Sequence, residues 1–532
     1  NPDVFWHLSA ARWMLEHRAF PSADWLSFTM AGRPWVDFEW LSQLIFHAAW
    51  SLGGYGGLWA LKLLLFAAGA ALLWLFLGLY RTSAAGRAVC VLAWALSLST
   101  ANDLRPENFS LVFFTALWGY IESGRLGARA QLRPLLEGAG FAAFFALWAN
   151  LHAGFVCGLA LLGIYAAADL AKRRSWRLPG VLALAAAASL LNPYGAALYR
   201  VLYEHYGALG ELKTFIREWQ EPGLHARWLW PFWAVLLASY LAALARQLRS
   251  HDVPAEHLAC LFLFGISASV HARMSVYFLS AAIPITACSF AGLAGGRRRA
   301  LLSAAAAAEL GFFFWAVVPE LGRFDFFQPR FVPAQLTRFL EAERAPLGGK
   351  RLFSPWHWGG YLGFKLTPDM KVFADGRYIF HGLLSPMYAA TRSPEDYRAF
   401  LDRYDVEVAA IERTRQFLPM EAALKGGRKA LLWRPFYLFF LPKKDWALVY
   451  WDSQGMAFIR RSAAPPHWLN GREFTAFRPD DLKAAEELLK EGRLRRADLA
   501  AEVERFASLA ADPADASAAR AWLAGLPLKK AP

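Results

Sequence analysis

The chain has 532 residues, of which 56% are hydrophobic and 19% charged, and its mean hydropathy is +0.25. Soluble proteins carry about 25% charged residues, so this composition excludes a wholly soluble protein. The formal net charge of +14 would favour nucleic-acid binding on a soluble chain. Here the Lys and Arg residues of the first half lie in short loops between apolar runs, as membrane topology requires, so we expect no nucleic-acid partner.

Residues 1–54 are predicted to form the first extracytoplasmic loop with interfacial helices, including an amphipathic stretch at 38–52. The candidate catalytic residues of this segment are Asp3, His7, Asp24 and Glu39. Asp3 and His7 are four positions apart, so they share one face of a helix. Nearby tryptophans favour general-base catalysis, because desolvation raises the pKa of a carboxyl group. An interfacial aromatic belt with capping aspartates is the alternative.

Residues 55–318 are predicted to form a transmembrane domain, because a spanning helix needs roughly 20 apolar residues. Long apolar runs recur there and give about ten membrane helices, or eleven with the stretch 38–52. The predicted spans are 55–80, 86–101, 107–123, 134–149, 154–171, 178–192, 228–246, 256–271, 274–294 and 300–318.

The loops between these spans alternate in charge. Every second loop is basic, from Arg81 and Arg87 in the first to the arginines 297–299 in the last. Basic loops stay on the cytoplasmic side, so the other loops are expected to face outwards, as is everything after Pro319. Polar residues of the kinds used in catalysis gather on this outward side.

Three outward turns carry candidate substrate-binding residues. These are Asp103, Arg105 and Glu107 in the turn at 102–107, His152 in the turn at 150–154, and His271 and Arg273 in the turn at 270–273. A guanidinium at the bilayer edge can bind a lipid phosphate through two hydrogen bonds. Helix capping, a hydrogen-bonded turn and interfacial snorkelling explain the same residues without a ligand, so both interpretations stay open.

After residue 319 the chain reads as ordinary globular sequence. Residues 319–462 are predicted to form an extracytoplasmic α/β domain and residues 463–532 a segment of amphipathic helices. The expected strands lie near 351–354, 371–374, 406–411, 446–450 and 456–460, and the expected helices near 384–391, 395–403 and 416–425. Asp375-Gly376-Arg377 follows one strand, where either a site or a plain turn with the glycine at positive φ fits.

The first segment carries a motif-level resemblance. Asn1-Pro2-Asp3 ahead of Trp6-His7, then Phe20-Pro21 ahead of Asp24, then Glu39-Trp40-Leu41, resembles bacterial membrane proteins of the GT-C glycosyltransferase superfamily. That group includes protein mannosyltransferases, aminoarabinose transferases and oligosaccharyltransferase catalytic subunits. Segments 358–362 and 373–377 also resemble the periplasmic domain of such proteins.

The resemblance implies many transmembrane helices, a polyprenyl-phosphate-linked sugar donor, and an Asp early in the first extracytoplasmic loop that acts as catalytic base or metal ligand. Asp3 occupies that position, which also implies a helix ahead of residue 1. The Asp-Glu pair of the mannosyltransferase motif is Asp3-Val4 here, so the donor class does not carry over. A divalent cation, if one is used, would be bound by Asp3, Asp24 or Glu39.

We therefore predict a multi-pass, GT-C-like glycosyltransferase of the bacterial inner membrane. It would move a sugar from a polyprenyl-phosphate-linked donor to a glycan, lipid or protein acceptor on the outer face. Asp3 would be the general base, and Arg105 or Arg273 would hold the leaving phosphate. The alternative is a non-enzymatic membrane scaffold. A transporter of lipid-linked glycans is disfavoured, because the predicted spans carry few acids beyond Glu137 and Glu309.

Overall fold

The computed structural model describes residues 2–98, 103–128, 133–290, 295–321, 331–423 and 429–526. The chain divides into two compact units. Beyond residue 1, unit 1 comprises Ala10–Ser22 and Val36–Phe327, and unit 2 comprises Pro2–Ser9, Ala23–Trp35 and Gln328–Pro532. Helix α1 (Asp3–His17) therefore begins in one unit and ends in the other.

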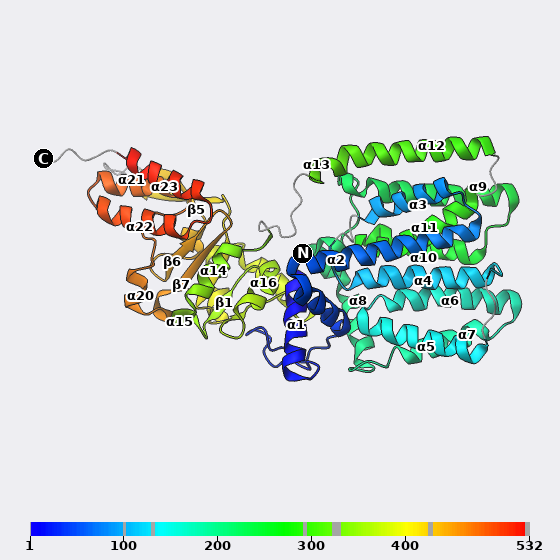
Figure 1. The fold of residues 1–532 in the computed structure, drawn as a ribbon. Helices are drawn as coiled ribbons and strands as arrows, with labels where there is room; N and C mark the ends of the chain where they lie inside the picture. Colours follow the sequence, from blue (N-terminus) through cyan, green and yellow to red (C-terminus); the bar gives the residue numbers. More distant parts are fainter. Residues whose placement is uncertain are drawn as a thin grey trace. The chain divides into compact units, whose positions relative to one another are not determined.

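Unit 1 is an all-helical bundle (Figure 1). Its helices after α1 are α2 (Trp40–Leu77), η1 (Gly78–Tyr80), α3 (Ala84–Ser97), α4 (Glu107–Arg125), α5 (Pro134–Leu151), α6 (Phe155–Arg173), α7 (Arg177–Ala188), α8 (Ala197–Phe215), η3 (Arg217–Trp219), η4 (Arg227–Leu229), α9 (Trp230–Ser250), α10 (Ala255–Val270), η5 (Ala272–Met274), α11 (Ser275–Phe290), α12 (Gly295–Phe312), η6 (Phe313–Val317) and α13 (Val318–Leu321).

Within the described residues, 5 helical segments are long and apolar enough to cross a membrane, and further apolar helices are shorter. The predicted spans coincide with helices α2 to α7 and α9 to α12. The ends of the spans predicted at 86–101 and 274–294, and Asn102, lie outside the described residues. The prediction of a multi-pass helical membrane protein is thus confirmed.

Helix α2 joins the amphipathic stretch 38–52 to the first span across a kink. Gly53 (φ −162°, ψ 21°) and Gly54 (φ 53°, ψ −131°) leave helical geometry there. Other residues rarely adopt the conformation of Gly54, so a glycine is needed where the chain changes direction. Elsewhere in the bundle glycines allow close helix packing, since a Cβ on Gly119 would overlap the Phe76 ring and one on Gly158 the Trp148 ring.

Unit 2 contains a five-stranded sheet in the order β2-β1-β3-β7-β6. Strands β1 (Arg351–Phe353), β2 (Lys371–Val372) and β3 (Val408–Glu412) are parallel, whereas β7 (Gly455–Arg460) pairs antiparallel with β3 and with β6 (Trp446–Trp451). The α/β prediction is confirmed. The helices of this unit are α14 (Ala334–Ala342), α15 (Arg344–Leu347), α16 (Trp356–Leu366), η8 (Tyr378–Phe380), α17 (His381–Ala390), α18 (Pro394–Arg403), α19 (Tyr437–Phe440), η9 (Arg461–Ala463), α20 (Pro466–Asn470), α21 (Leu482–Lys490), α22 (Arg496–Leu509) and α23 (Pro513–Gly525).

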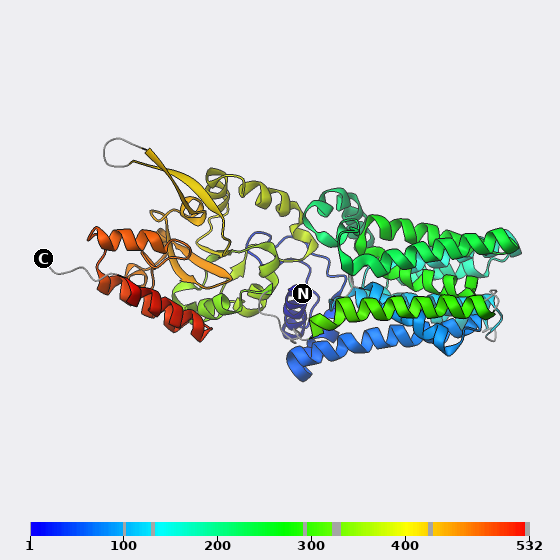
Figure 2. The ribbon, with the colours of Figure 1, turned by 90° about the horizontal axis from the view of Figure 1, so that it is seen from above.

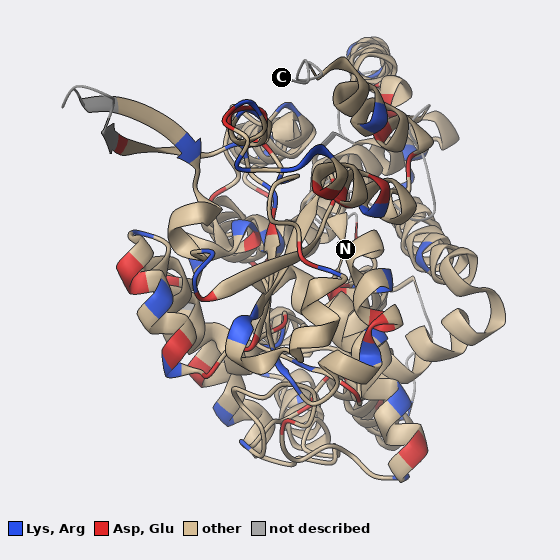
Figure 3. Ribbon diagram, turned by 90° about the vertical axis from the view of Figure 1, so that its left-hand side faces the viewer, with Lys and Arg blue, Asp and Glu red and all other residues tan. Residues whose placement is uncertain are grey.

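The helix predicted at 416–425 is wrong. Residues Phe417–Ala423 form strand β4, which pairs antiparallel with β5 (Lys429–Pro435), and residues 424 and 425 lie outside the described part. A Gly-Gly pair between the strands is the hairpin signal that helix propensity obscured. The hairpin stands away from the rest of unit 2 (Figure 2). Basic and acidic residues are interspersed along the ribbon of this unit (Figure 3).

Candidate active site

Two arginines from separate turns of unit 1 meet at one glutamate. Arg105 lies just ahead of α4, and Arg273 lies in η5. Arg105 Nη1 forms an ion pair with Glu218 Oε2, and Arg273 Nη1 lies 3.5 Å from the same oxygen. Arg273 Nε also contacts Glu107 Oε2 at 2.7 Å. We call Arg105, Glu107, Glu218 and Arg273 the arginine cluster.

The η3 and η5 turns hold Arg273 in place. The backbone amide of Ala272 donates to the Gln220 carbonyl at 2.9 Å. His271 Nδ1 lies 2.8 Å from the Trp219 carbonyl, which can only accept, so the ring proton of a neutral His271 sits on Nδ1. The Arg273 guanidinium also lies over the Trp219 ring, 5.5 Å from its centroid. His271 therefore braces the turn that carries Arg273.

The arginine cluster is partly accessible to solvent. Its two guanidiniums balance its two carboxylates, but the Arg273 and Glu218 side chains keep 25% and 26% of their exposure. Each guanidinium has five N–H donors in a planar fork that matches a phosphate group. Glu218 Oε2 occupies the position between the guanidiniums that an anionic oxygen of a ligand would take, so such a ligand would compete with this carboxylate.

His152 and Glu39 supply two further hydrogen-bond donors near the Arg273 guanidinium. His152 Nδ1 accepts from the Gly154 amide at 3.0 Å and lies 2.8 Å from Ser110 Oγ. The proton of the neutral ring is therefore on Nε2, which lies 3.9 Å from Glu39 Oε1. Burial, reinforced by the charge of Arg273, holds the pKa of His152 well below its usual value.

The surroundings of the Glu39 carboxyl group favour its protonated form. Burial raises the pKa of Glu39 to about 8, although the positive charge of Arg273 acts in the opposite direction. The nearby carboxylates of Asp37 and Glu107 contribute to the increase in this pKa. Of the other candidates in unit 1, Asp103 is exposed and lies in the electrostatic field of Lys62 on α2.

In unit 2, Asp3 opens helix α1 and packs on the loop after β2. Asp3 is half-buried, His7 is buried, and the His7 ring lies 3.6 Å from the Trp6 ring, centroid to centroid. A Cβ on Gly376 would overlap Asp3 Oδ1 and lie 3.0 Å from Trp6 Nε1. The prediction of a positive φ at Gly376 is wrong, because its backbone does not adopt the left-handed conformation. The close approach of Asp3 explains the glycine instead.

Asp24 lies in a buried ion triad with Arg377 and Asp375. Arg377 Nη2 contacts Asp24 Oδ1 at 2.7 Å and Asp375 Oδ2 at 2.8 Å, and all three side chains are at most 1% exposed. Asp24 also accepts from the Ser27 amide at 3.2 Å and from Ser27 Oγ at 2.5 Å. With its oxygens so occupied, Asp24 does not fit a metal site. Among the described residues, no three His, Cys, Asp or Glu side chains are grouped to hold a metal ion.

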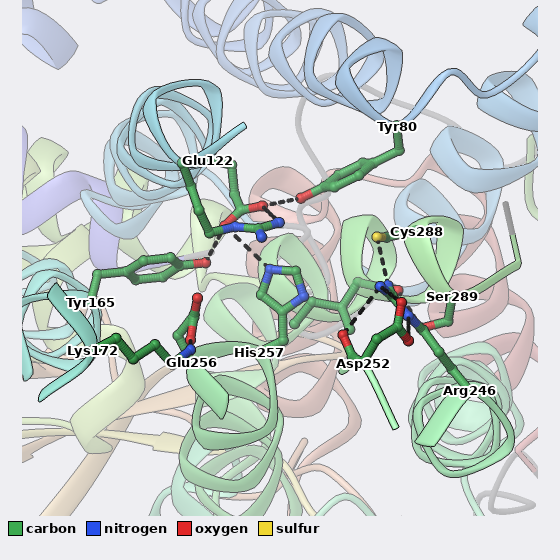
Figure 4. A network of polar contacts seen from close by, with 12 residues as sticks. Tyr80, Glu122, Tyr165, Lys172, Arg246, Asp252, Glu256, His257, Cys288 and Ser289 are labelled. Atoms are coloured by element: carbon green, nitrogen blue, oxygen red, sulfur yellow. Dashed lines mark hydrogen bonds and ion pairs between the residues drawn. The ribbon is translucent and has the colours of Figure 1, made fainter. Parts of the chain in front are cut away.

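A further buried carboxylate of unit 1, Glu122, is not among the residues that the sequence singles out. Glu122 accepts from Tyr80 at 2.7 Å, from Tyr165 at 2.6 Å and from Arg125 at 2.7 Å, and His257 Nε2 lies 3.2 Å away (Figure 4). These partners come from η1, α6, α4 and α10. The Glu122 network therefore connects four elements of the bundle. Its position at the end of an apolar run, close to Arg125, had hidden it among loop charges.

The fold of the chain is similar to that of a solved oligosaccharyltransferase, which confirms the predicted fold class of a multi-pass helical membrane protein with a C-terminal α/β domain. No protein-family model and no curated protein matches the sequence. Among solved structures, the chain is similar to the archaeal oligosaccharyltransferase AglB from Archaeoglobus fulgidus, in complex with an inhibitory peptide and a dolichol-phosphate. The TM-score is 0.59 at 10% identity, over 98% of this chain and 79% of that one. ArnT from Cupriavidus metallidurans bound to undecaprenyl phosphate has a TM-score of 0.48 at 14% identity, over 88% and 95% of the two chains.

Proposed function

We propose that this protein is a membrane glycosyltransferase that takes a sugar from a polyprenyl-phosphate-linked donor. The observation that carries the proposal is the arginine cluster, in which two guanidiniums from different turns share one replaceable carboxylate. A fold similar over 98% of the chain to a structure that contains a dolichol-phosphate supports the same ligand class. Such a cluster would bind the phosphate of the donor and stabilise the charge that develops on it.

The proposed reaction has Asp3 as general base. Asp3 takes the proton of an acceptor hydroxyl or amide, and the acceptor atom forms a bond to the anomeric carbon of the sugar. The bond between that carbon and the phosphate oxygen breaks, and its electron pair leaves with the polyprenyl phosphate. Arg105 and Arg273 bind this leaving group, and the neutral donors Glu39 and His152 contribute hydrogen bonds to it.

We further propose that the transfer takes place on the outer face of a bacterial inner membrane. Basic loops alternate along the predicted spans, and the positive-inside rule assigns the turns with Arg105, His152 and Arg273 to the opposite side. The chain after Pro319 would lie on that same outer side. His7 would orient the acceptor, which can be a glycan, a lipid or a protein.

Binding and turnover together test this proposal. Affinity for undecaprenyl phosphate, measured in nanodiscs against undecaprenol as the uncharged control, should fall at least about tenfold in Arg273→Lys, because a lysine cannot form the two-pronged contact. Arg200→Lys is the matched control, since Arg200 is an exposed arginine on α8 that is 69% accessible. Release of polyprenyl phosphate from a lipid-linked sugar extract should be lost in Asp3→Asn. A protein that ignores the phosphate group and keeps its cellular role without Asp3 is a scaffold.

A further inference from the structure

Two segments of unit 2 that stood out in the sequence, 358–362 and 373–377, form a seat for the start of α1. A Cβ on Gly360 would lie 3.1 Å from the Pro2 carbonyl and 3.5 Å from Trp6. The next residue, Tyr361, packs edge-on against Phe5, with ring centroids 4.8 Å apart. We call Gly359, Gly360, Gly376 and Arg377 the N-terminal seat.

The glycines of this seat are explained by close approach. A Cβ on Gly359 would overlap the Ala374 carbonyl, so the glycine lets α16 lie directly on the loop after β2. A Cβ on Gly376 would overlap the Asp3 carboxylate. In the loop after β2 and in α16, the glycines therefore let the backbone itself approach the first turn of α1, with no side chain between them.

Arg377 attaches the following segment, Ala23–Trp35, to the same loop. Its guanidinium bridges Asp24 and Asp375 and lies over the Trp35 ring at 4.6 Å from the centroid. The segment also joins the edge of the sheet, where the Phe28 amide donates to the Val372 carbonyl at 3.1 Å. The start of α1 and the segment Ala23–Trp35 are therefore both held by the loop that carries Gly376 and Arg377.

We infer that Arg377 and Gly376 are positioning residues for Asp3. This inference rests on the proposed function, in which Asp3 is the base. A base acts only when its oxygen is held within hydrogen-bond reach of the proton it removes, and a displacement of about 1 Å can reduce the rate about 100-fold. Residues of unit 2 then set the position of the Asp3 carboxylate.

Three variants of the full chain test the inference. Gly376→Ala places a methyl group where the Asp3 carboxylate lies, and Arg377→Met leaves Asp24 and Asp375 buried without their cation. Gly382→Ala is the matched control, because a Cβ there has no atom within 4 Å. Hydrogen exchange of the amides 4–9 and turnover of a lipid-linked sugar extract are measured for each variant, with Asp3→Asn in parallel.

We expect Arg377→Met to speed hydrogen exchange of the amides 4–9 about 100-fold. Gly376→Ala and Arg377→Met should each lower kcat about 100-fold and leave the donor KM unchanged. The control should match the wild type. Exchange that stays at the wild-type rate in Arg377→Met overturns the seat, and faster exchange with undiminished kcat overturns the positioning role. If Asp3→Asn keeps full turnover, the general-base proposal fails and the positioning role with it, while the exchange result still decides whether the seat exists.

Discussion

The carboxyl group of Glu39 is expected to make the stability of unit 1 depend on pH. A pKa raised from 4.5 to about 8 corresponds to about 5 kcal/mol between the protonated and ionised forms in the folded chain. The side chain is only 13% exposed, so solvent reduces this value little. Because the pKa is raised on folding, the stabilisation is complete below pH 4.5 and is lost as the pH rises through about 8.

Glu39→Gln keeps the shape and hydrogen bonding of the protonated acid and removes its ionisation. The melting temperature of the purified protein should then fall as the pH rises from about 4.5 to 8 in the wild type and stay nearly flat in this variant. Affinity for undecaprenyl phosphate should also weaken above pH 8 in the wild type alone, because an ionised Glu39 adds negative charge near Arg273. Glu204→Gln, at a site 63% exposed, is the control. Identical pH profiles for Glu39→Gln and the wild type would refute the reasoning.

Three further variants probe the bundle. Arg273→Lys should raise the donor KM at least about tenfold and leave the melting temperature unchanged within error, as measured by turnover and thermal unfolding. Glu122→Gln should destabilise unit 1 by about 3 kcal/mol, because it disrupts a buried charged network. The reaction of the buried Cys260 with a thiol dye on heating would report this loss of stability. Gly154→Ala should cost about 1–3 kcal/mol in the same assay, since its Cβ would overlap the Tyr277 hydroxyl, whereas Gly163→Ala, with its nearest contact at 3.8 Å, should not.

Much of the helical bundle could be predicted because a membrane leaves few options. Every spanning segment needs a continuous apolar run, so helices such as α4 and α6 begin and end within a few residues of their predicted limits. Helix α8 was not predicted, because it lies in the loop between the spans predicted at 178–192 and 228–246 and mixes charged with apolar residues. The hairpin of β4 and β5 was missed for a different reason, since Ala, Leu and Glu in β4 favour a helix locally and only the pairing with β5 makes it a strand.

Three of the four residues of the arginine cluster were candidates from the sequence, but Glu218 and the pairings were not predictable. Arg105 and Arg273 stood out because each lies in a short turn between apolar runs that was predicted to face outwards. Glu218, which joins them, lies in a long loop without a motif and could be found only from the folded chain. Asp24 likewise gave no sign that its partner is Arg377, more than 350 positions away in the sequence, because a long-range ion pair leaves no local sequence pattern.

The central claim is that this chain breaks the bond between a sugar and a polyprenyl phosphate. The most direct measurement is mass spectrometry of free polyprenyl phosphate after the reconstituted protein is incubated with lipid-linked sugars extracted from bacterial membranes. Free polyprenyl phosphate should accumulate over many turnovers with the wild type, and none should accumulate above background with Asp3→Asn. Equal amounts of free polyprenyl phosphate with the wild type, with Asp3→Asn and without protein would contradict this claim.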